Sequence, residues 1–182
     1  MFACEFLDKA VDFMCISKGI TSGYLPLAAT LTTDKIYQAF YADYKEKKTF
    51  YHGHTYTANP VSCSAALASL KVFEEEGTLL KAKKLIPILT NKLEEFRGLA
   101  LVGDVRYIGL IGAIELVENK KTKQRFTLEK RIGLEVFKRG LKNNLILRPL
   151  GSIVYLFLPL CVKQEELEDI LARTYSVIES LG

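Results

Sequence analysis

A lysine at the end of a short apolar run is the first candidate for chemistry in this sequence. Lys18 follows the segment FMCIS (residues 13–17) and precedes Gly19, Thr21 and Ser22. A neutral lysine amine is a nucleophile that forms Schiff bases with aldehydes, and burial at a strand end is one way to favour the neutral form. Lys18 is therefore a candidate catalytic nucleophile, whereas the local sequence by itself favours the alternative, a solvated loop lysine.

A second candidate lies in the loop FYHGHTYTANP, residues 50–60, directly before a predicted helix. Free backbone N–H groups and the dipole at a helix N-terminus favour an anion, so this loop, with the hydroxyls of Thr55 and Thr57, is a candidate phosphate site. As alternatives, Thr55 and Thr57 are turn and capping hydroxyls. His52 and His54 have no carboxylate nearby in the sequence and are interpreted as hydrogen-bonded loop residues, so no metal site is predicted.

Arg148 is the third candidate, because it ends an apolar run and is followed by Pro149, Leu150 and Gly151. A strand before it and a proline after it would fix the direction of its guanidinium group, whose planar fork matches a carboxylate. Arg148 is therefore predicted to bind a substrate carboxylate. An internal salt bridge is the alternative, and the sequence alone supports it equally.

Composition excludes several classes of protein. The 182 residues are 49% hydrophobic, which suits one large domain or two small ones with a real core. No run approaches the roughly 18 apolar residues of a membrane span, and the N-terminus lacks a signal-peptide pattern, so a soluble, cytoplasmic protein without a membrane partner is expected. The net charge of +4 comes from scattered lysines, which argues against a nucleic-acid partner. Four widely spaced cysteines predict buried, reduced thiols.

The first candidate is predicted to lie between two strands. Apolar runs predict strands at residues 11–17 and 25–32, the first of them buried. A helix is expected to begin at residue 33 or 34 and to run through residue 44.

A longer helix is predicted from residue 60 to residue 76. Asn59 would be its N-cap, Pro60 its first helical residue, and Gly77 would end it. Its many small side chains predict a tightly packed core helix, or a helix that lies close to a neighbouring backbone or ligand.

The rest of the chain is predicted to be a connector and a compact α+β unit. A helix over residues 79–96, kinked at Pro87, would connect two domains whose boundary lies between residues 77 and 98. After it, the pattern predicts strands at 99–103, 106–117, 145–149 and 152–159, and helices at 128–143 and 164–181.

Four segments together resemble the class III, fold-type I aminotransferases that use pyridoxal 5'-phosphate. They are SKGITSGYLPLAATLTTDKIY, FYHGHTYTANPVSCSAALASLKVFEEE, VGDVRYIGLIGAIEL and LRPLGSIVYLFLP. The GYLPLA, HGHTYTANP and RPLG parts are most similar to the subgroup that aminates 8-amino-7-oxononanoate in biotin biosynthesis. The resemblance implies an α/β fold, with an incomplete cofactor-binding large domain at 1–77, a connecting helix at 78–97 and an α+β small domain at 98–182.

The resemblance also implies which residues hold the cofactor. Lys18 would bind the cofactor aldehyde and, once displaced by substrate, carry a proton between substrate and cofactor. Thr55 and the backbone at His54 would bind the cofactor phosphate, in this family usually across the interface of a homodimer.

Substrate-binding residues are implied in the same way. Gly53 would line the substrate site, Arg148 would bind the carboxylate of the keto acid, and Tyr155 would lie near the same pocket. The implied substrates are 8-amino-7-oxononanoate and an amino donor, S-adenosylmethionine or lysine.

The chain also departs from the family pattern. Family members are much longer, and the aspartate, aromatic residue and phosphate loop that they carry before the lysine are not in this sequence. The chain is therefore interpreted as part of a longer aminotransferase. The alternatives are a non-catalytic remnant and another class III enzyme that acts on an ω-amine. Ser22 stands where the family commonly has glycine.

Overall fold

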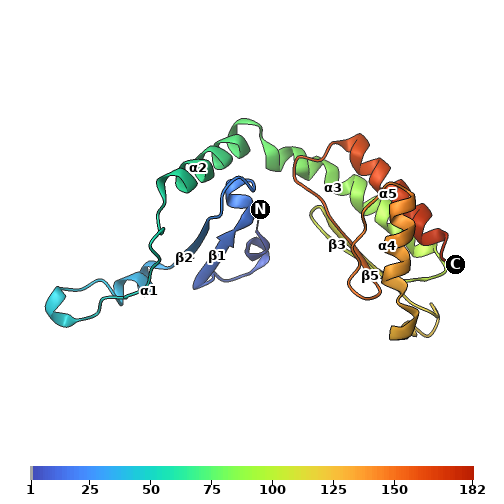
Figure 1. Cartoon of the computed structure of the whole chain (residues 1–182), viewed down its shortest axis with the longest axis horizontal. Helices are drawn as coiled ribbons and strands as arrows, with labels where there is room; N and C mark the ends of the chain where they lie inside the picture. The colour runs from blue at the N-terminus through green and yellow to red at the C-terminus, as the bar shows by residue number, and fades with distance from the viewer. Residues whose placement is uncertain (1) are drawn as a thin grey trace. The chain divides into compact units, whose positions relative to one another are not determined.

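The computed structural model describes residues 2–182 of the chain. Its backbone divides into two compact units, with the boundary between Gly77 and Thr78. Figure 1 shows that each unit combines helices with an antiparallel sheet.

The first unit is built around a two-stranded antiparallel sheet. Strand β1 (Phe13–Ser17) pairs with β2 (Ala28–Thr32), so that Ser17 lies opposite Ala28. A short 3-10 helix, η2 (Lys18–Thr21), follows β1 directly. The two predicted strands are thus present, although each begins later than the pattern indicated.

The prediction that β1 is buried is wrong for this structure. Only Met14 and Ile16 are partly covered, whereas Phe13, Cys15 and Ser17 are exposed. A sheet of two strands has two faces, and among the described residues only one of them is partly packed. The apolar run predicts the strand correctly but does not say what covers it.

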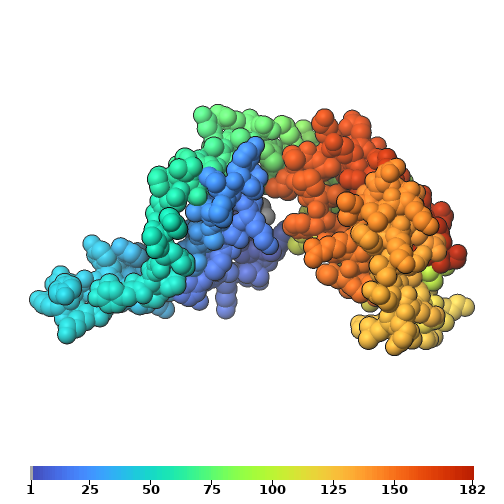
Figure 2. Space-filling model, in the orientation of Figure 1, coloured from blue at the N-terminus to red at the C-terminus, as the bar shows by residue number. Residues whose placement is uncertain are grey.

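The helix predicted over residues 33–44 is shorter in the structure. Helix α1 covers Asp34–Gln38 and a 3-10 helix, η3, covers Tyr44–Glu46. Aromatic rings of this region pack on one another: the ring centroids of Phe40, between the two helices, and Phe50, after η3, are 5.1 Å apart. The residues between α1 and η3 are therefore not helical, because tertiary contacts override a weak helical propensity. Around these residues the chain stands out from the body of the first unit as an arm, drawn in cyan in Figure 2.

Helix α2 (Pro60–Glu75) begins at the predicted residue and ends one residue before the predicted end. The Asn59 side chain accepts hydrogen bonds from the backbone N–H groups of Val61 (3.1 Å) and Ser62 (3.0 Å), which makes it an N-cap. Gly77 follows the helix with φ +60°, a backbone conformation that glycine adopts without strain. Local signals therefore set both ends of α2.

Replacing Asn59 by alanine should lower the free energy of unfolding by about 1 kcal/mol, because two backbone N–H groups lose their acceptor. Asn59→Asp keeps an acceptor oxygen and should retain most of the stability. Urea unfolding followed by far-UV circular dichroism measures both variants, since the chain has no tryptophan. Equal losses in the two variants would contradict the capping role.

The second unit packs three helices against one three-stranded sheet. Its elements are α3 (Thr78–Glu95), η4 (Phe96–Gly98), β3 (Val102–Ile108), β4 (Ile111–Leu116), η5 (Leu128–Lys130), α4 (Ile132–Lys142), β5 (Ile153–Phe157) and α5 (Gln164–Glu179). The sheet order is β3-β4-β5, with both pairs antiparallel. Helix α3 is a single α-helix with Pro87 inside it.

One strand predicted in this unit is absent. Residues 145–149 form no strand, because Leu145 donates its N–H to Gly140 O (2.9 Å) at the end of α4 and Pro149 has no N–H to donate. Pairing resumes only at Leu150, which exchanges hydrogen bonds with Ile153.

The core of the second unit lies between the helices and one face of the sheet. Leu89 and Leu93 of α3 have no exposed surface, and neither do Ile114 of β4 and Val154 of β5. Burial of a side chain of this size contributes roughly 1.5–3 kcal/mol. Helix α3 therefore contributes directly to the core of the second unit.

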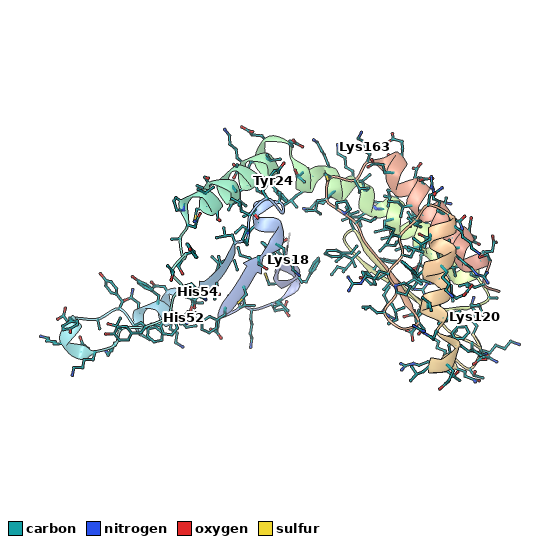
Figure 3. The ribbon with its side chains drawn as sticks, viewed as in Figure 1. Lys18, Tyr24, His52, His54, Lys120 and Lys163 are labelled. Carbon is teal, nitrogen blue, oxygen red and sulfur yellow. The ribbon has the colours of Figure 1, made fainter. Side chains whose placement is uncertain are left out.

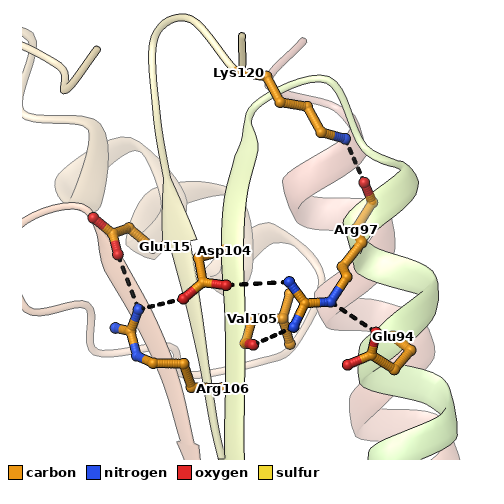
Figure 4. Close-up of polar contacts among 7 residues, drawn as sticks. All are labelled: Glu94, Arg97, Asp104, Val105, Arg106, Glu115 and Lys120. Atoms are coloured by element: carbon orange, nitrogen blue, oxygen red, sulfur yellow. Dashed lines mark hydrogen bonds and ion pairs between the residues drawn. The ribbon is translucent and has the colours of Figure 1, made fainter. Parts of the chain in front are cut away.

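A network of ion pairs joins the other face of the sheet to the end of α3 and to η4 (Figure 4). Asp104 accepts hydrogen bonds from Arg106 (2.8 Å) and Arg97 (3.1 Å). Arg106 also donates to Glu115 on the neighbouring strand at 3.0 Å, and Arg97 donates to Glu94 at 2.7 Å. Hydrogen bonds from Arg106, and next from Arg97, hold the pKa of Asp104 below its ordinary value.

This network predicts a loss of stability in acid. Because the pKa of Asp104 is lower in the folded chain than in the unfolded chain, its contribution is fully present above the unfolded pKa of about 3.9 and is lost as the pH falls through the folded value. Asp104→Asn should cost about 0.5–1 kcal/mol at pH 7, since water screens a side chain that is 34% exposed, and should flatten the stability profile below about pH 5.

Urea unfolding at a series of pH values between 3 and 7 tests this. Asp169→Asn is the matched control, because Asp169 makes a single exposed i,i+4 pair with Arg173, worth about 0.3–0.5 kcal/mol. If the free energy of unfolding of Asp104→Asn falls as steeply below pH 5 as that of the wild-type chain, Asp104 is not the source of the acid sensitivity.

Candidate active site

Lys18 begins a turn whose backbone is held by a buried hydroxyl. It is the first residue of η2 and has φ +54°, a left-handed conformation that costs free energy for any residue except glycine. The hydroxyl of Thr21, which is 1% exposed, donates to Leu25 O at 2.5 Å and lies 3.5 Å from Lys18 O. The turn therefore closes on itself directly behind the lysine.

The side chain of Lys18 is exposed in this structure. A pocket of about 720 Å³ beside it is lined by residues 17–19, 23 and 25–28. The expected burial at the end of β1 is therefore not found among the described residues. The fold instead gives Lys18 a backbone held by hydrogen bonds and places its side chain beside an open pocket.

The loop before α2 is folded around a threonine hydroxyl. The backbone N–H of His54 donates to Thr57 Oγ1 at 2.8 Å, and the backbone N–H of Thr57 donates to His54 O at 3.0 Å. Thr57 is thus a turn hydroxyl, as the alternative held. Thr55 is exposed, and no partner for its hydroxyl is found within residues 2–182.

The prediction that the N-terminus of α2 offers free donors to an anion is wrong. Pro60 has no N–H, and Asn59 already accepts from Val61 and Ser62. The free donors of this region lie instead in the loop, at Thr55. A good N-cap and an anion site compete for the same N–H groups.

The two histidines belong to a row of rings. The ring centroid of Phe50 lies 5.5 Å from that of His52, which lies 5.8 Å from that of His54. Gly53 lies between the histidines, and a Cβ built on it meets no atom within 4 Å. Figure 3 shows that Lys18 comes from the turn after β1, whereas both histidines come from the loop before α2.

Arg148 and Tyr155 flank one tight turn in the second unit. Leu150 N–H donates to Ile153 O at 2.8 Å, and Ile153 N–H donates to Leu150 O at 3.0 Å. Arg148 comes two residues before this turn, and Tyr155 comes two residues after it, in β5 opposite Ala113. The turn therefore lies between Arg148, the predicted carboxylate-binding residue, and Tyr155, which was predicted near the same pocket, within the same unit.

Arg148 and Arg106 differ in their partners, although both belong to the second unit. Arg106 is neutralised by two carboxylates, whereas Arg148 is exposed and has no ion pair with any residue in the described part of the chain. The internal salt bridge proposed as an alternative for Arg148 is therefore not found there. Its guanidinium is available to an external anion.

Sequence reasoning missed one contact of the first unit, a hydroxyl pair between Ser22 and Ser69. Ser62, Ala66 and Ser69 recur at i, i+4 and i+7 and are the buried residues of α2. This spacing of small residues indicates that one side of α2 is buried. It does not indicate which residues pack against that side.

Neither a metal site nor a membrane-spanning helix is found within residues 2–182. No group of three His, Cys, Asp or Glu side chains there is placed to hold a metal ion. No helix of that range is both long enough and apolar enough to cross a membrane.

Comparison with known proteins agrees with this arrangement. The class-III aminotransferase family model matches residues 1–178. The adenosylmethionine-8-amino-7-oxononanoate aminotransferase of Aquifex aeolicus (strain VF5) is 47% identical to the chain over 181 residues, which is 100% of this chain and 40% of that enzyme. The chain thus spans about 40% of the length of this relative.

Solved structures give the same result. The enzyme of that name from Methanocaldococcus jannaschii DSM 2661 superimposes with a TM-score of 0.87 at 40% identity, covering 93% of this chain and 39% of that one. An amine transaminase from an uncultivated Pseudomonas species, in its PLP-bound form, superimposes with a TM-score of 0.85 at 31% identity and covers 94% of this chain and 39% of that one. The predicted α/β fold of the fold-type I aminotransferases is confirmed, and the chain belongs to the class-III aminotransferase family.

Proposed function

We propose that this chain carries the lysine and the carboxylate-binding arginine of an aminotransferase that converts 8-amino-7-oxononanoate to 7,8-diaminononanoate in biotin biosynthesis. The amino donor is S-adenosylmethionine or lysine, and the enzyme is cytoplasmic. The observation that carries the proposal is Lys18, which begins a fixed turn and opens onto a pocket in a chain 47% identical to an enzyme with that name.

The groups of the first unit fit pyridoxal phosphate. An aldehyde requires a primary amine with free approach, which the exposed Lys18 offers. A phosphate requires unengaged donors, and the Thr55 hydroxyl has no partner within residues 2–182. When bound, pyridoxal phosphate supplies an aldehyde carbon that exchanges amines and a ring that withdraws electrons.

Each proposed site residue then has a distinct task. Lys18 Nζ would hold the cofactor until substrate displaces it, and would then carry a proton between the substrate carbon and the cofactor. Thr55, with the loop at His54, contacts the phosphate, and Gly53 leaves room for substrate because it has no side chain.

The substrate carboxylate would be bound in the second unit. The unpaired Arg148 offers two parallel N–H donors to a carboxylate, which is a stronger and more directional contact than a lysine makes. Tyr155 would line the same pocket. Binding of the carboxylate would orient the ketone of 8-amino-7-oxononanoate for reaction.

We propose in addition that the enzyme is a homodimer in which the loop carrying Thr55 faces the cofactor of the partner subunit. Support comes from aromatic side chains that this region leaves in solvent: Tyr44 is 89% exposed, Tyr51 88% and Tyr56 82%. Aromatic residues are enriched in the buried cores of protein interfaces. Analytical ultracentrifugation of the chain, with Tyr51→Ser as the variant, measures whether this region associates.

A chimera tests the proposed activity. Residues 1–182 would replace the matching 40% of the Aquifex aeolicus relative, and 7,8-diaminononanoate would be measured with S-adenosylmethionine, lysine or an ω-amine such as putrescine as donor. We expect diaminononanoate from 8-amino-7-oxononanoate with at least one of the first two donors. A chimera that unfolds as cooperatively as its parent but uses only the ω-amine would contradict the proposal.

Arg148→Leu in the chimera tests the carboxylate role. We expect KM for 8-amino-7-oxononanoate to rise about 10- to 100-fold, since a charge-assisted bidentate pair contributes about 1.5–3 kcal/mol. Arg173→Leu is the control, because Arg173 pairs with Asp169 on the surface of α5. Equal KM values in the two variants would exclude Arg148 from substrate binding.

A further inference from the structure

The lysine turn is joined to helix α2 by a pair of serine hydroxyls. Ser22 Oγ and Ser69 Oγ are 2.8 Å apart, although the two residues are 47 positions apart in the sequence. The distance is that of a well-formed O–H···O hydrogen bond. Ser69 is 8% exposed, so water has little access to its hydroxyl.

Ser22 occupies a backbone conformation that does not favour serine. Its φ is +51° and its ψ is +26°, the left-handed region in which glycine is the residue of least strain. A glycine at this position would relieve that strain but would leave Ser69 without its partner. The hydroxyl contact to α2 is therefore what the serine adds.

The contact reaches Lys18 through the backbone of η2. Ser22 N–H donates to Gly19 O at 3.0 Å and so closes the turn that begins at Lys18. Thr21 fixes the same turn from inside, through its bond to Leu25 O. Fixing the Ser22 side chain on a helix therefore fixes the end of a four-residue turn that starts with the lysine.

Helix α2 is suited to hold this contact. The buried stripe of Ser62, Ala66 and Ser69 has no large side chain, so that the turn can approach the helix backbone closely. Sixteen residues of capped helix form a more rigid support than the exposed two-stranded sheet on the other side of the lysine.

We infer that Ser22 is a positioning residue, which through Ser69 fixes the direction in which Lys18 Nζ points. The inference rests on the proposed function of Lys18. It predicts that loss of either hydroxyl makes the lysine less reactive toward an aldehyde without unfolding the chain.

Trapping with pyridoxal 5'-phosphate tests the inference on the full 182-residue chain. Lys18 Nζ condenses with the aldehyde carbon with loss of one water, and borohydride then reduces the C=N bond to a stable secondary amine. Mass spectrometry gives the labelling of Lys18 relative to the exposed Lys142 of the second unit. The variants are Ser22→Gly, Ser69→Ala, the double variant, and Ser64→Ala, a control on the exposed side of α2.

We expect Ser22→Gly and Ser69→Ala each to lower the Lys18-to-Lys142 ratio at least three-fold, the double variant to lower it no further, and Ser64→Ala to leave it unchanged. The urea midpoint of Ser22→Gly should stay within error of the wild type, because glycine relieves the strained φ. A merely structural role would lower the midpoint and leave the ratio intact.

Two outcomes separate the inference from the proposed function. If wild-type Lys18 is labelled preferentially and both serine variants keep its ratio, the positioning role is wrong and the function of Lys18 stands. If wild-type Lys18 is labelled no more than Lys142, the proposed function fails and the positioning role fails with it.

Discussion

Lys18→Ala should abolish transamination by the chimera, with kcat lower by at least about 10²- to 10⁴-fold. The lysine has two tasks, holding the cofactor and moving the proton, and alanine performs neither. The same change in the 182-residue chain should remove the pyridoxal phosphate adduct from the peptide that contains residue 18. Steady-state rates and peptide mass spectrometry measure the two effects separately.

Lys9→Ala is the matched control for this prediction, because Lys9 is an exposed lysine of the same unit that lies beside a different pocket. It should keep both the rate and the adduct. A small primary amine added to Lys18→Ala should restore part of the rate, since the missing group is an amine that transfers a proton. Undiminished turnover by Lys18→Ala would remove the lysine from the mechanism.

Gly133→Ala should destabilise the second unit by roughly 1–3 kcal/mol and also weaken substrate binding. A Cβ on Gly133, near the start of α4, would overlap the carbonyl oxygen of Gly151 and lie 3.1 Å from Pro149 Cβ. The overlapped atom belongs to the backbone, so either α4 or the turn must move. That turn carries Arg148, and its displacement should raise KM for the carboxylate substrate in the chimera.

The control is Gly98→Ala, in the same unit. A Cβ on Gly98 meets no atom within 4 Å, so the free energy of unfolding should change by no more than about 0.5 kcal/mol. Urea midpoints measure both variants. If Gly133→Ala is as stable as Gly98→Ala, the close packing of α4 on the RPLG turn does not constrain Arg148.

Signals that act within a few residues predicted much of the fold. Asn59 and Pro60 mark the start of α2, and Gly77 marks its end, because a cap and a left-handed glycine act on the neighbouring backbone groups alone. The strand before Lys18 follows from its apolar run in the same way. Secondary structure is predicted wrongly where contacts with residues farther away along the chain replace the local pattern. The ring contact of Phe40 with Phe50 shortens the predicted helix, and the bond of Leu145 to the end of α4 removes the strand predicted at residues 145–149.

The same distinction between local signals and distant contacts applies to the candidate site. The sequence by itself determined that a lysine directly follows a strand, that hydroxyls lie in a loop before a capped helix, and that an arginine precedes Pro149. Only the tertiary structure decided which groups are free. The Asn59 side chain accepts hydrogen bonds from the backbone N–H groups at the start of α2. Two carboxylates neutralise Arg106, whereas Arg148 has no ion pair among the described residues. The Ser22 and Ser69 hydroxyls meet across 47 positions. Hydrogen bonds and ion pairs depend on distances of about 3 Å, and residue spacing along a chain does not set such distances between separate elements.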